Sequence, residues 1–209
     1  MSKTVLAWHF TCGVRFRDGT AMPPEGRWPD HDGEITRKET GLRAQENMLD
    51  ACAAAKGSMI HRVEMRQIIE KIGYVDIIGK ERQIIASEDI RDLLRDFARF
   101  AAWTAFPMWN VPDTVREWVE TGNEELRDAA YRAADDTWEP FGNECSPKAM
   151  ARQITETATN VIVTKAAYHT ADGMSGTTAD RSVCRKRREV FEELLTNAVR
   201  ARLGLKENE

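Results

Sequence analysis

Several features that mark special classes of protein are missing from this chain of 209 residues. No run of about 18 apolar residues is present, so the sequence offers no membrane-spanning helix. The opening MSKTVLAWHF lacks the basic segment and the long apolar core of a signal peptide. With 42% hydrophobic and 31% charged residues the composition is globular, which excludes a disordered chain. We therefore expect a cytoplasmic protein that has no membrane association.

Cysteine is scarce and widely spaced. Cys12, Cys52, Cys145 and Cys184 form no C-x-x-C pair, and no histidine lies at ligand spacing from any of them. The segment Asp30-His31-Asp32-Gly33 offers three candidate metal ligands, but consecutive side chains point in different directions and the distant glutamate of a calcium loop is missing. We therefore expect reduced thiols and no metal site.

Neither sign of charge dominates. There are 30 Lys and Arg residues against 34 Asp and Glu residues, so the net charge is −4. A dedicated nucleic-acid binder would be basic, and this balance argues against nucleic acid as the partner. One basic cluster, Arg181 to Arg188, could contact phosphates or an acidic protein. On a helix its charges would spread around the axis and be followed by glutamates, which favours an ordinary solvated face.

Familiar catalytic patterns are absent as well. The sequence contains no G-x-x-x-x-G-K-[ST], no G-x-G-x-x-G, no G-x-S-x-G and no H-E-x-x-H. P-loop nucleotide hydrolysis, Rossmann oxidoreduction, α/β-hydrolase chemistry and zincin proteolysis are therefore not expected. We predict a protein that is not an enzyme and needs no cofactor.

The first 86 residues are rich in glycine, proline and β-branched residues. Thr4–Phe10 is predicted to be a buried strand, Asn47–Ala55 a short helix, and the alternation from Met59 to Met65 indicates another strand. Further short strands are predicted at 14–17 before a turn at Asp18-Gly19, and at 67–72, 74–78 and 83–86.

The remaining residues have helical periodicity with clear caps. Ser87 is predicted to be the N-cap of a helix that Pro107 ends near Phe106. Four more helices are predicted to begin at Pro112, at Asn123, at Ser146 and after Gly176, the last ending before Gly204. The predicted fold class is therefore α+β, with a small mixed α/β N-terminal module (residues 1–86) followed by a helical bundle-like domain (residues 87–209).

Aromatic residues gather in the predicted helical domain. Trp103, Phe106, Trp109 and Trp118 are close in sequence, and the favoured interpretation is a seam where two helices pack together. The alternative is a partner-binding patch with indole anchors. Together with the basic cluster, this alternative gives the candidate partner-binding residues Trp103, Trp109, Trp118, Arg185, Arg187 and Arg188.

A set of short motifs is spread over most of the chain. It comprises Trp8-His9-Phe10, Arg17-Asp18-Gly19, Gly41-Leu42-Arg43-Ala44, the stretch Leu93–Arg99, Trp109–Asp113 and Glu120–Arg127. With the alanines that follow, the set resembles an uncharacterised family of phages and prophages whose members pair a short N-terminal module with an Ala-rich helical tail. The resemblance implies a phage context, in which a small accessory or counter-defence protein binds a host or viral protein.

The N-terminal half also resembles the ADP-ribosyltransferase-type fold. His9 on the first strand, Gly41-Leu42-Arg43 before a short helix, and the strand around Val63 follow the order of that fold. The resemblance implies a degenerate NAD-binding protein with His9, Arg43 and Glu81 as its catalytic set, although Arg43 replaces the aromatic residue that stacks on nicotinamide. A lone histidine beside Trp8 is otherwise typical of a hydrogen-bonded core residue.

Three hypotheses therefore stand side by side. The leading one is a phage-encoded accessory or counter-defence protein that binds a host or phage protein in the cytoplasm. The second is an NAD-binding, ADP-ribosyltransferase-like protein, and the third is a nucleic-acid-associated protein that uses the basic cluster. A single sequence names neither the partner nor the oligomeric state, so a homo-oligomer stays open.

Overall fold

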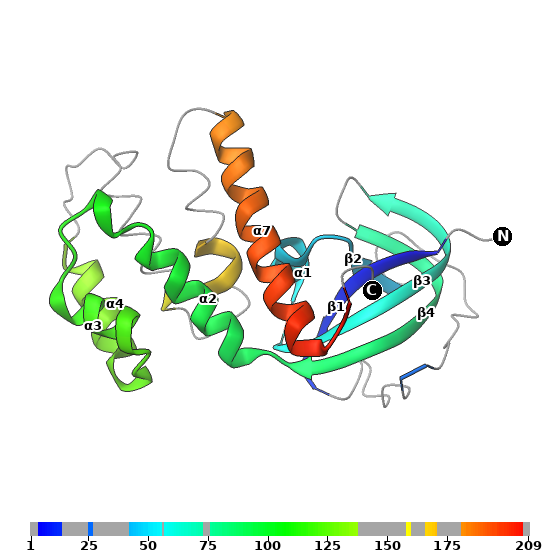
Figure 1. Ribbon diagram of the computed structural model, residues 1–209, viewed down its shortest axis with the longest axis horizontal. Helices are drawn as coiled ribbons and strands as arrows, with labels where there is room; N and C mark the ends of the chain where they lie inside the picture. The colour runs from blue at the N-terminus through cyan, green and yellow to red at the C-terminus, as the bar shows by residue number, and fades with distance from the viewer. Residues whose placement is uncertain are drawn as a thin grey trace. The chain divides into compact units, whose positions relative to one another are not determined.

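A computed structural model describes residues 4–13, 25–26, 42–55, 57–72, 76–137, 158–159, 166–170 and 181–206. Strands occupy the first part of the chain and helices the later part, which confirms the predicted α+β class (Figure 1). The chain forms two compact units. The first consists of Met1–Ile90 with Thr196–Glu209, and the second consists of Arg91–Leu195.

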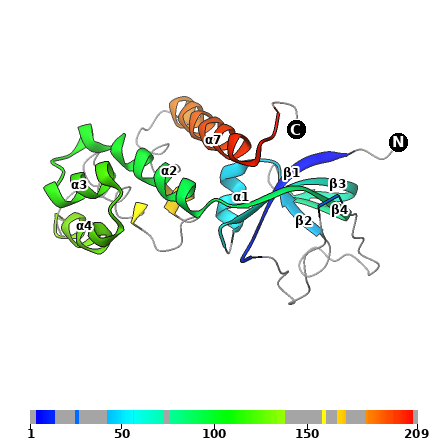
Figure 2. The ribbon, with the colours of Figure 1, turned by 60° about the horizontal axis from the view of Figure 1, so that its bottom comes forward.

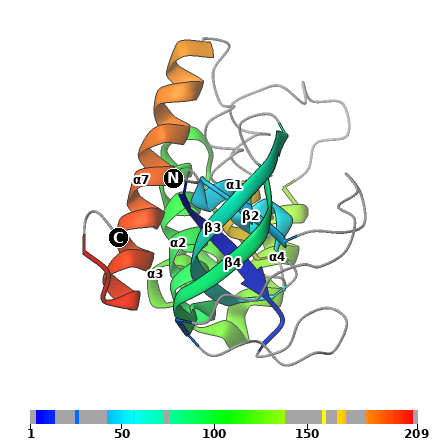
Figure 3. The same cartoon turned by 90° about the vertical axis from the view of Figure 1, so that its right-hand side faces the viewer.

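The first unit is built around four antiparallel strands, β1 (Val5–Thr11), β2 (Leu42–Gln45), β3 (Met59–Ile72) and β4 (Asp76–Asp89). Their order β1-β2-β4-β3 closes on itself, because β1 pairs with both β2 and β3 (Figure 3). The helix α1 (Met48–Ala54) follows β2 and begins after Asn47, as its sequence predicts.

The prediction of several short strands between residues 59 and 86 was wrong, because β3 and β4 are two continuous strands of 14 residues each. Irregularities in their pairing occur between Arg62 and Val63 and between Ile68 and Glu70, and Gln67 has a positive φ of 47°. Such bulges interrupt the apolar alternation without ending a strand. This explains why one long strand has the sequence pattern of several short ones.

Ser87 is not a helix N-cap, contrary to the sequence prediction. It lies in β4, opposite His61 of β3, and this pairing continues as far as Asp89 opposite Met59. The helix α2 (Arg91–Trp103) begins only after the strand has ended. Strand pairing with a partner that lies far away in the sequence therefore takes precedence over the local capping signal.

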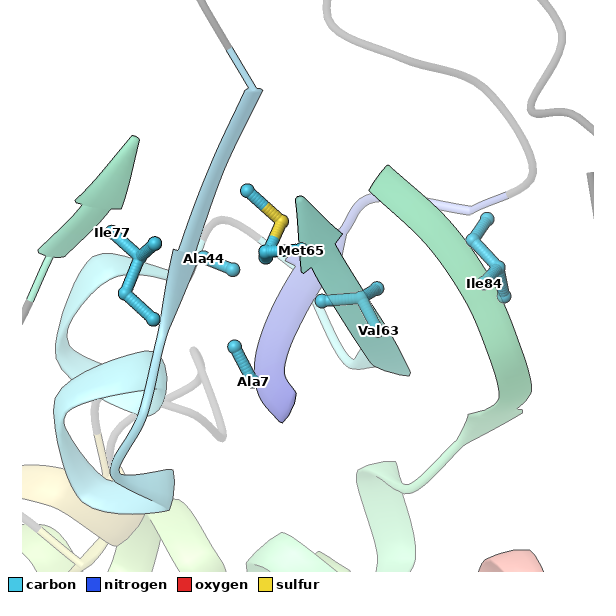
Figure 4. Close-up of a cluster of buried hydrophobic side chains, with 6 residues drawn as sticks. All are labelled: Ala7, Ala44, Val63, Met65, Ile77 and Ile84. Carbon is cyan, nitrogen blue, oxygen red and sulfur yellow. The ribbon is translucent and has the colours of Figure 1, made fainter. Parts of the chain in front are cut away.

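The interior of the closed sheet is apolar over most of its length. Figure 4 shows the side chains that gather between the strands, and they come from all four of them: Ala7, Ala44, Val63, Met65, Ile77 and Ile84. Because side chains alternate between the two faces of a strand, His9 and Thr11 share this inner face with Ala7, and His61 shares it with Val63. One end of the interior is therefore polar.

The second unit contains α2, α3 (Asp113–Thr121), α4 (Arg127–Asp135) and the first part of α7 (Arg181–Leu203), with short 3-10 turns η1 (Phe106–Met108) and η2 (Glu124–Leu126) (Figure 2). The predicted helix start at Pro112 and stop at Gly122 are confirmed. Asn123 accepts a hydrogen bond from the Glu125 N–H, as a cap should, although it opens η2 rather than one long helix. The predictions at 14–17, 18–19, 30–33 and 146, and those at Gly173 and Gly176, lie outside the described residues.

Gly122 gives a stability prediction for the second unit. It ends α3 with a φ of 69°, and a Cβ there would overlap the guanidinium group of Arg99, whose Nη1 donates to the Val119 carbonyl over 3.1 Å. Gly122→Ala should therefore lower the free energy of unfolding by about 1–2 kcal/mol, measured by urea denaturation.

Gly204→Ala is the matched control for that substitution. Gly204 also has a positive φ, of 67°, but among the described residues nothing lies within 4 Å of an added Cβ. The control should therefore show the backbone penalty alone, about 1 kcal/mol. Equal losses for the two variants would mean that displacing Arg99 costs nothing.

Candidate functional site

The polar end of the closed sheet is a row of three side chains on three strands. His9 of β1 lies opposite His61 of β3, and His61 lies opposite Ser87 of β4. The rings of His9 and His61 are 6.1 Å apart between centroids. His61 is buried with 2% of its surface exposed, whereas Ser87 is exposed. The row therefore leads from the interior of the sheet to the surface.

A chain of hydrogen bonds connects Gly13, Thr11, His61 and Ser87. Thr11 Oγ1 donates to the Gly13 carbonyl over 2.6 Å, and in that arrangement it accepts from His61. The His61 Nε2, 2.9 Å from Thr11 Oγ1, then carries the proton. In the neutral ring Nδ1 is left as an acceptor, and the Ser87 hydroxyl donates to it over 2.7 Å.

The electrostatic surroundings keep both histidines neutral. Burial, and after it the positive charge of Arg82, lowers the pKa of His61 to about 4. The pKa of His9 is also lowered well below its ordinary value by burial, Arg82 and His61, while a hydrogen bond with the Arg43 backbone opposes this. Arg82 is itself buried, with a pKa lowered to about 10 by desolvation, and it stays charged at neutral pH.

The catalytic set implied by the ADP-ribosyltransferase resemblance is only partly brought together. His9 forms a hydrogen bond with the backbone of Arg43. Arg82 Nη1 donates a hydrogen bond to the Arg43 carbonyl over 3.1 Å. Glu81 precedes Arg82 in β4, so its side chain lies on the opposite face of the strand, where it accepts a hydrogen bond from Gln67 of β3. His9 and Glu81 therefore do not face one another.

Trp8 and Arg62 occupy the outer face of the same two strands. The Arg62 guanidinium lies over the Trp8 ring at 4.3 Å from its centroid, and both residues are buried. Burial, and then the charge of Arg200 in the last turns of α7, lowers the pKa of Arg62 to about 10. The pair is therefore a buried contact between a cation and an aromatic ring within the first unit.

The three candidate tryptophans of the second unit differ in exposure. Trp118 is fully buried and Trp109 is 8% exposed, whereas Trp103 is 54% exposed. Phe106 is buried too, so most of this aromatic group belongs to the packing of the unit. Of the three predicted indole anchors, only Trp103 presents its ring to solvent.

The candidate arginines lie on the first turns of α7. Arg185 and Arg187 are exposed, and Arg185 lies 3.8 Å from Glu189 in an exposed ion pair. Arg188 is partly buried, with its guanidinium 5.7 Å from the centroid of the Tyr168 ring. These charges therefore point in different directions around the helix, as the sequence predicts.

A groove of about 380 Å³ lies between the end of α2, where Thr104 follows the helix, and this part of α7. We name it the α2–α7 groove, and it is lined by Thr104, Val183, Lys186, Arg187, Val190 and Phe191. Phe97 of α2 packs edge-on against Phe191, with ring centroids 6.0 Å apart. Large apolar side chains on the same two helices remain exposed: Phe100 at 46%, Trp103 at 54%, Val190 at 53% and Leu194 at 45%.

Within the described ranges, no cluster of three or more His, Cys, Asp or Glu side chains could hold a metal ion. Cys12 is exposed and Cys52 is buried in the core. None of the helices that the structure describes combines the length and the apolar character needed to cross a bilayer.

Comparison with models of known protein families, with curated proteins and with solved structures finds no match to this chain. The functional proposals therefore rest on the hydrogen-bonded residues around His61 and on the α2–α7 groove. Sequence reasoning had pointed to His9, Trp103, Arg185 and Arg187. It missed the Thr11, His61 and Ser87 hydrogen-bond chain, for which the alternation around His61 was the only local signal.

Proposed function

We propose that this chain acts by binding another protein, and that the α2–α7 groove with the exposed side chains around it is the contact surface. The observation that supports this is the exposure of four large apolar residues on two adjacent helices. Single exposed apolar residues are ordinary on protein surfaces. Here Val190 lines the groove, and Phe100, Trp103 and Leu194 are exposed on the same two helices. Several exposed apolar side chains near a groove are typical of protein interfaces, where aromatic residues contribute most of the binding energy.

The charge of the groove favours a particular kind of partner segment. Lys186 and Arg187 line the groove beside Val190, and Val183, Arg187, Val190 and Leu194 follow one stripe of α7 at spacings of four, three and four residues. An amphipathic helix with apolar and acidic side chains would complement this stripe. We therefore propose an acidic amphipathic helix of a host or phage protein as the bound segment.

The phage context belongs to the same proposal. It is supported by the resemblance of the motifs between Trp8 and Arg127 to an uncharacterised phage family. A small protein that acts through a contact surface can inhibit or redirect a host factor by occupying its binding site. An accessory or counter-defence role is the form that protein binding would take in that setting.

Site-directed variants used as bait in host lysate test this proposal. Trp103→Asp and Val190→Asp should each reduce capture of a specific protein at least about tenfold, because each places a charge at an apolar contact. Tyr131→Asp is the matched control, since Tyr131 is an exposed aromatic residue of α4, a helix that does not belong to the proposed surface. Capture should also weaken as salt is raised, because the basic residues contribute.

Two outcomes would overturn the proposal. One is capture of the same proteins at the same level by all three variants, which would place binding elsewhere. The other is self-association of the purified chain that the groove variants abolish, detected by sedimentation, since the groove would then serve a second copy.

A further inference from the structure

Ser87 combines two properties that are rarely joined in a structural serine. It is exposed near the end of β4, and its hydroxyl proton is directed at a ring nitrogen of a buried histidine over 2.7 Å. A serine that only stabilises strand pairing could equally accept a proton from the ring. In the arrangement in which Thr11 Oγ1 donates to the Gly13 carbonyl, His61 carries its proton on Nε2 and accepts the Ser87 hydroxyl proton at Nδ1.

The three residues have the relationship of a nucleophile, a base and a group that orients the base. The Ser87 hydroxyl lies within proton-transfer distance of His61, and Thr11 holds the opposite edge of the same ring at 2.9 Å. The Gly13 carbonyl in turn fixes the Thr11 hydroxyl. Such a set is recognised by geometry and roles rather than by its order in the sequence.

We propose that Ser87 is a nucleophile that accepts acyl groups from activated carboxylic esters, with His61 as its general base and Thr11 as a positioning residue. Ser87 Oγ attacks the ester carbonyl carbon while its proton passes to His61 Nδ1. Collapse of the tetrahedral intermediate breaks the bond to the leaving oxygen, which takes the proton back from His61. The products are an acyl ester on Ser87 and a free alcohol, and no other reactant is consumed.

The surroundings of His61 slow this step. Burial, and after it the positive charge of Arg82, opposes protonation of His61, which makes His61 a weak base and the acylation slow. The His61 ring is neutral at pH 7, so it can accept the Ser87 proton without first losing one of its own. A reactive ester is consequently the substrate class that this site could use.

Labelling of the full chain with a fluorophosphonate and with p-nitrophenyl acetate, read by peptide mass spectrometry, tests the proposal. Both reagents should modify Ser87 at least about tenfold faster than Ser182, an exposed serine of α7 that serves as an internal control in the same sample. The adduct should disappear in Ser87→Ala. In His61→Gln, which keeps a polar side chain but removes the general base, labelling of Ser87 should fall at least about tenfold.

The comparison with Ser182 needs no substitution, so it remains informative even if His61→Gln fails to fold. Labelling of Ser87 at the rate of Ser182, or no adduct on Ser87, would overturn the proposal. An unchanged rate in a folded His61→Gln variant would also overturn it, because the histidine would then not act as the base. Protein binding by the second unit is tested separately and does not enter this result.

Discussion

Replacing Trp118 by alanine should lower the free energy of unfolding of the second unit by about 3–5 kcal/mol, because the indole is fully buried and its removal leaves a cavity. The same replacement at Trp103, which is 54% exposed, should change the free energy by less than about 0.5 kcal/mol. The two residues are of the same type and lie in the same unit. Their difference therefore measures burial alone.

Hydrogen exchange of the α3 and α2 amides measures this effect within the second unit. Trp118→Phe is a useful third variant, because the Trp118 indole N–H is buried and finds no hydrogen-bond partner among the described residues. Phenylalanine keeps much of the apolar volume and removes that unsatisfied donor, so its cost should stay below about 1.5 kcal/mol. A Trp118→Ala variant as stable as Trp103→Ala would contradict the buried position of Trp118.

This distinction also decides which variants can test protein binding. A loss of partner capture in Trp118→Ala would follow from a damaged fold and would say nothing about an interface. Trp103→Asp changes a side chain that the fold does not need, so a loss of capture there reports on the surface. Of the tryptophans proposed as anchors, Trp103 is therefore the informative one.

Local signals predicted those parts of the fold that depend on a few neighbouring residues. Pro112 before α3, Gly122 in the left-handed conformation after it, and Gly204 after α7 act through their own backbone preferences. The burial of Trp118 could also have been predicted, because it shares a helical face with Val115 and Val119. These signals need no knowledge of the rest of the chain.

The polar site could not be predicted in this way because strand pairing creates it. His61 lies 50 residues from Thr11 and 26 residues from Ser87, and only the register of β1, β3 and β4 places their side chains in contact. The sequence around Ser87 even favours a different structure, since a serine followed by two acidic residues is a typical helix start. The contact with His61 became visible only when the pairing of β4 was known.

Acidification from about pH 7 to about pH 5.5 should weaken the first unit through its two sheet histidines. The folded-state pKa of His61 is about 4, and that of His9 is also lowered, whereas both should titrate at ordinary values in the unfolded chain. The unfolded chain therefore binds protons in this range while the folded chain does not. For a lowered histidine pKa, stability is lost as the pH falls through the unfolded value, and the loss from His61 ends near pH 4.

The expected size for His61 follows from its ordinary pKa of about 6.5 and its folded-state pKa of about 4. His61 should reduce the free energy of unfolding by about 1 kcal/mol over this pH interval, and His9 acts in the same direction. The interval stays above the range in which most carboxylates titrate, which keeps their contribution small. Hydrogen exchange of the β3 and β4 amides at the two pH values reports this change for the first unit.

Substitution of His61 separates its contribution to the loss of stability on acidification from that of His9. His61→Gln should lose less stability on acidification than the parent chain, although its stability at pH 7 is lower, and the double variant with His9→Gln should lose less still. His169→Gln, in the second unit, controls for the removal of a histidine elsewhere. If His61→Gln loses as much as the parent, the folded sheet does not resist protonation of this ring. Nδ1 of His61 would then carry a proton at mildly acidic pH, and Ser87 would have no acceptor for its own.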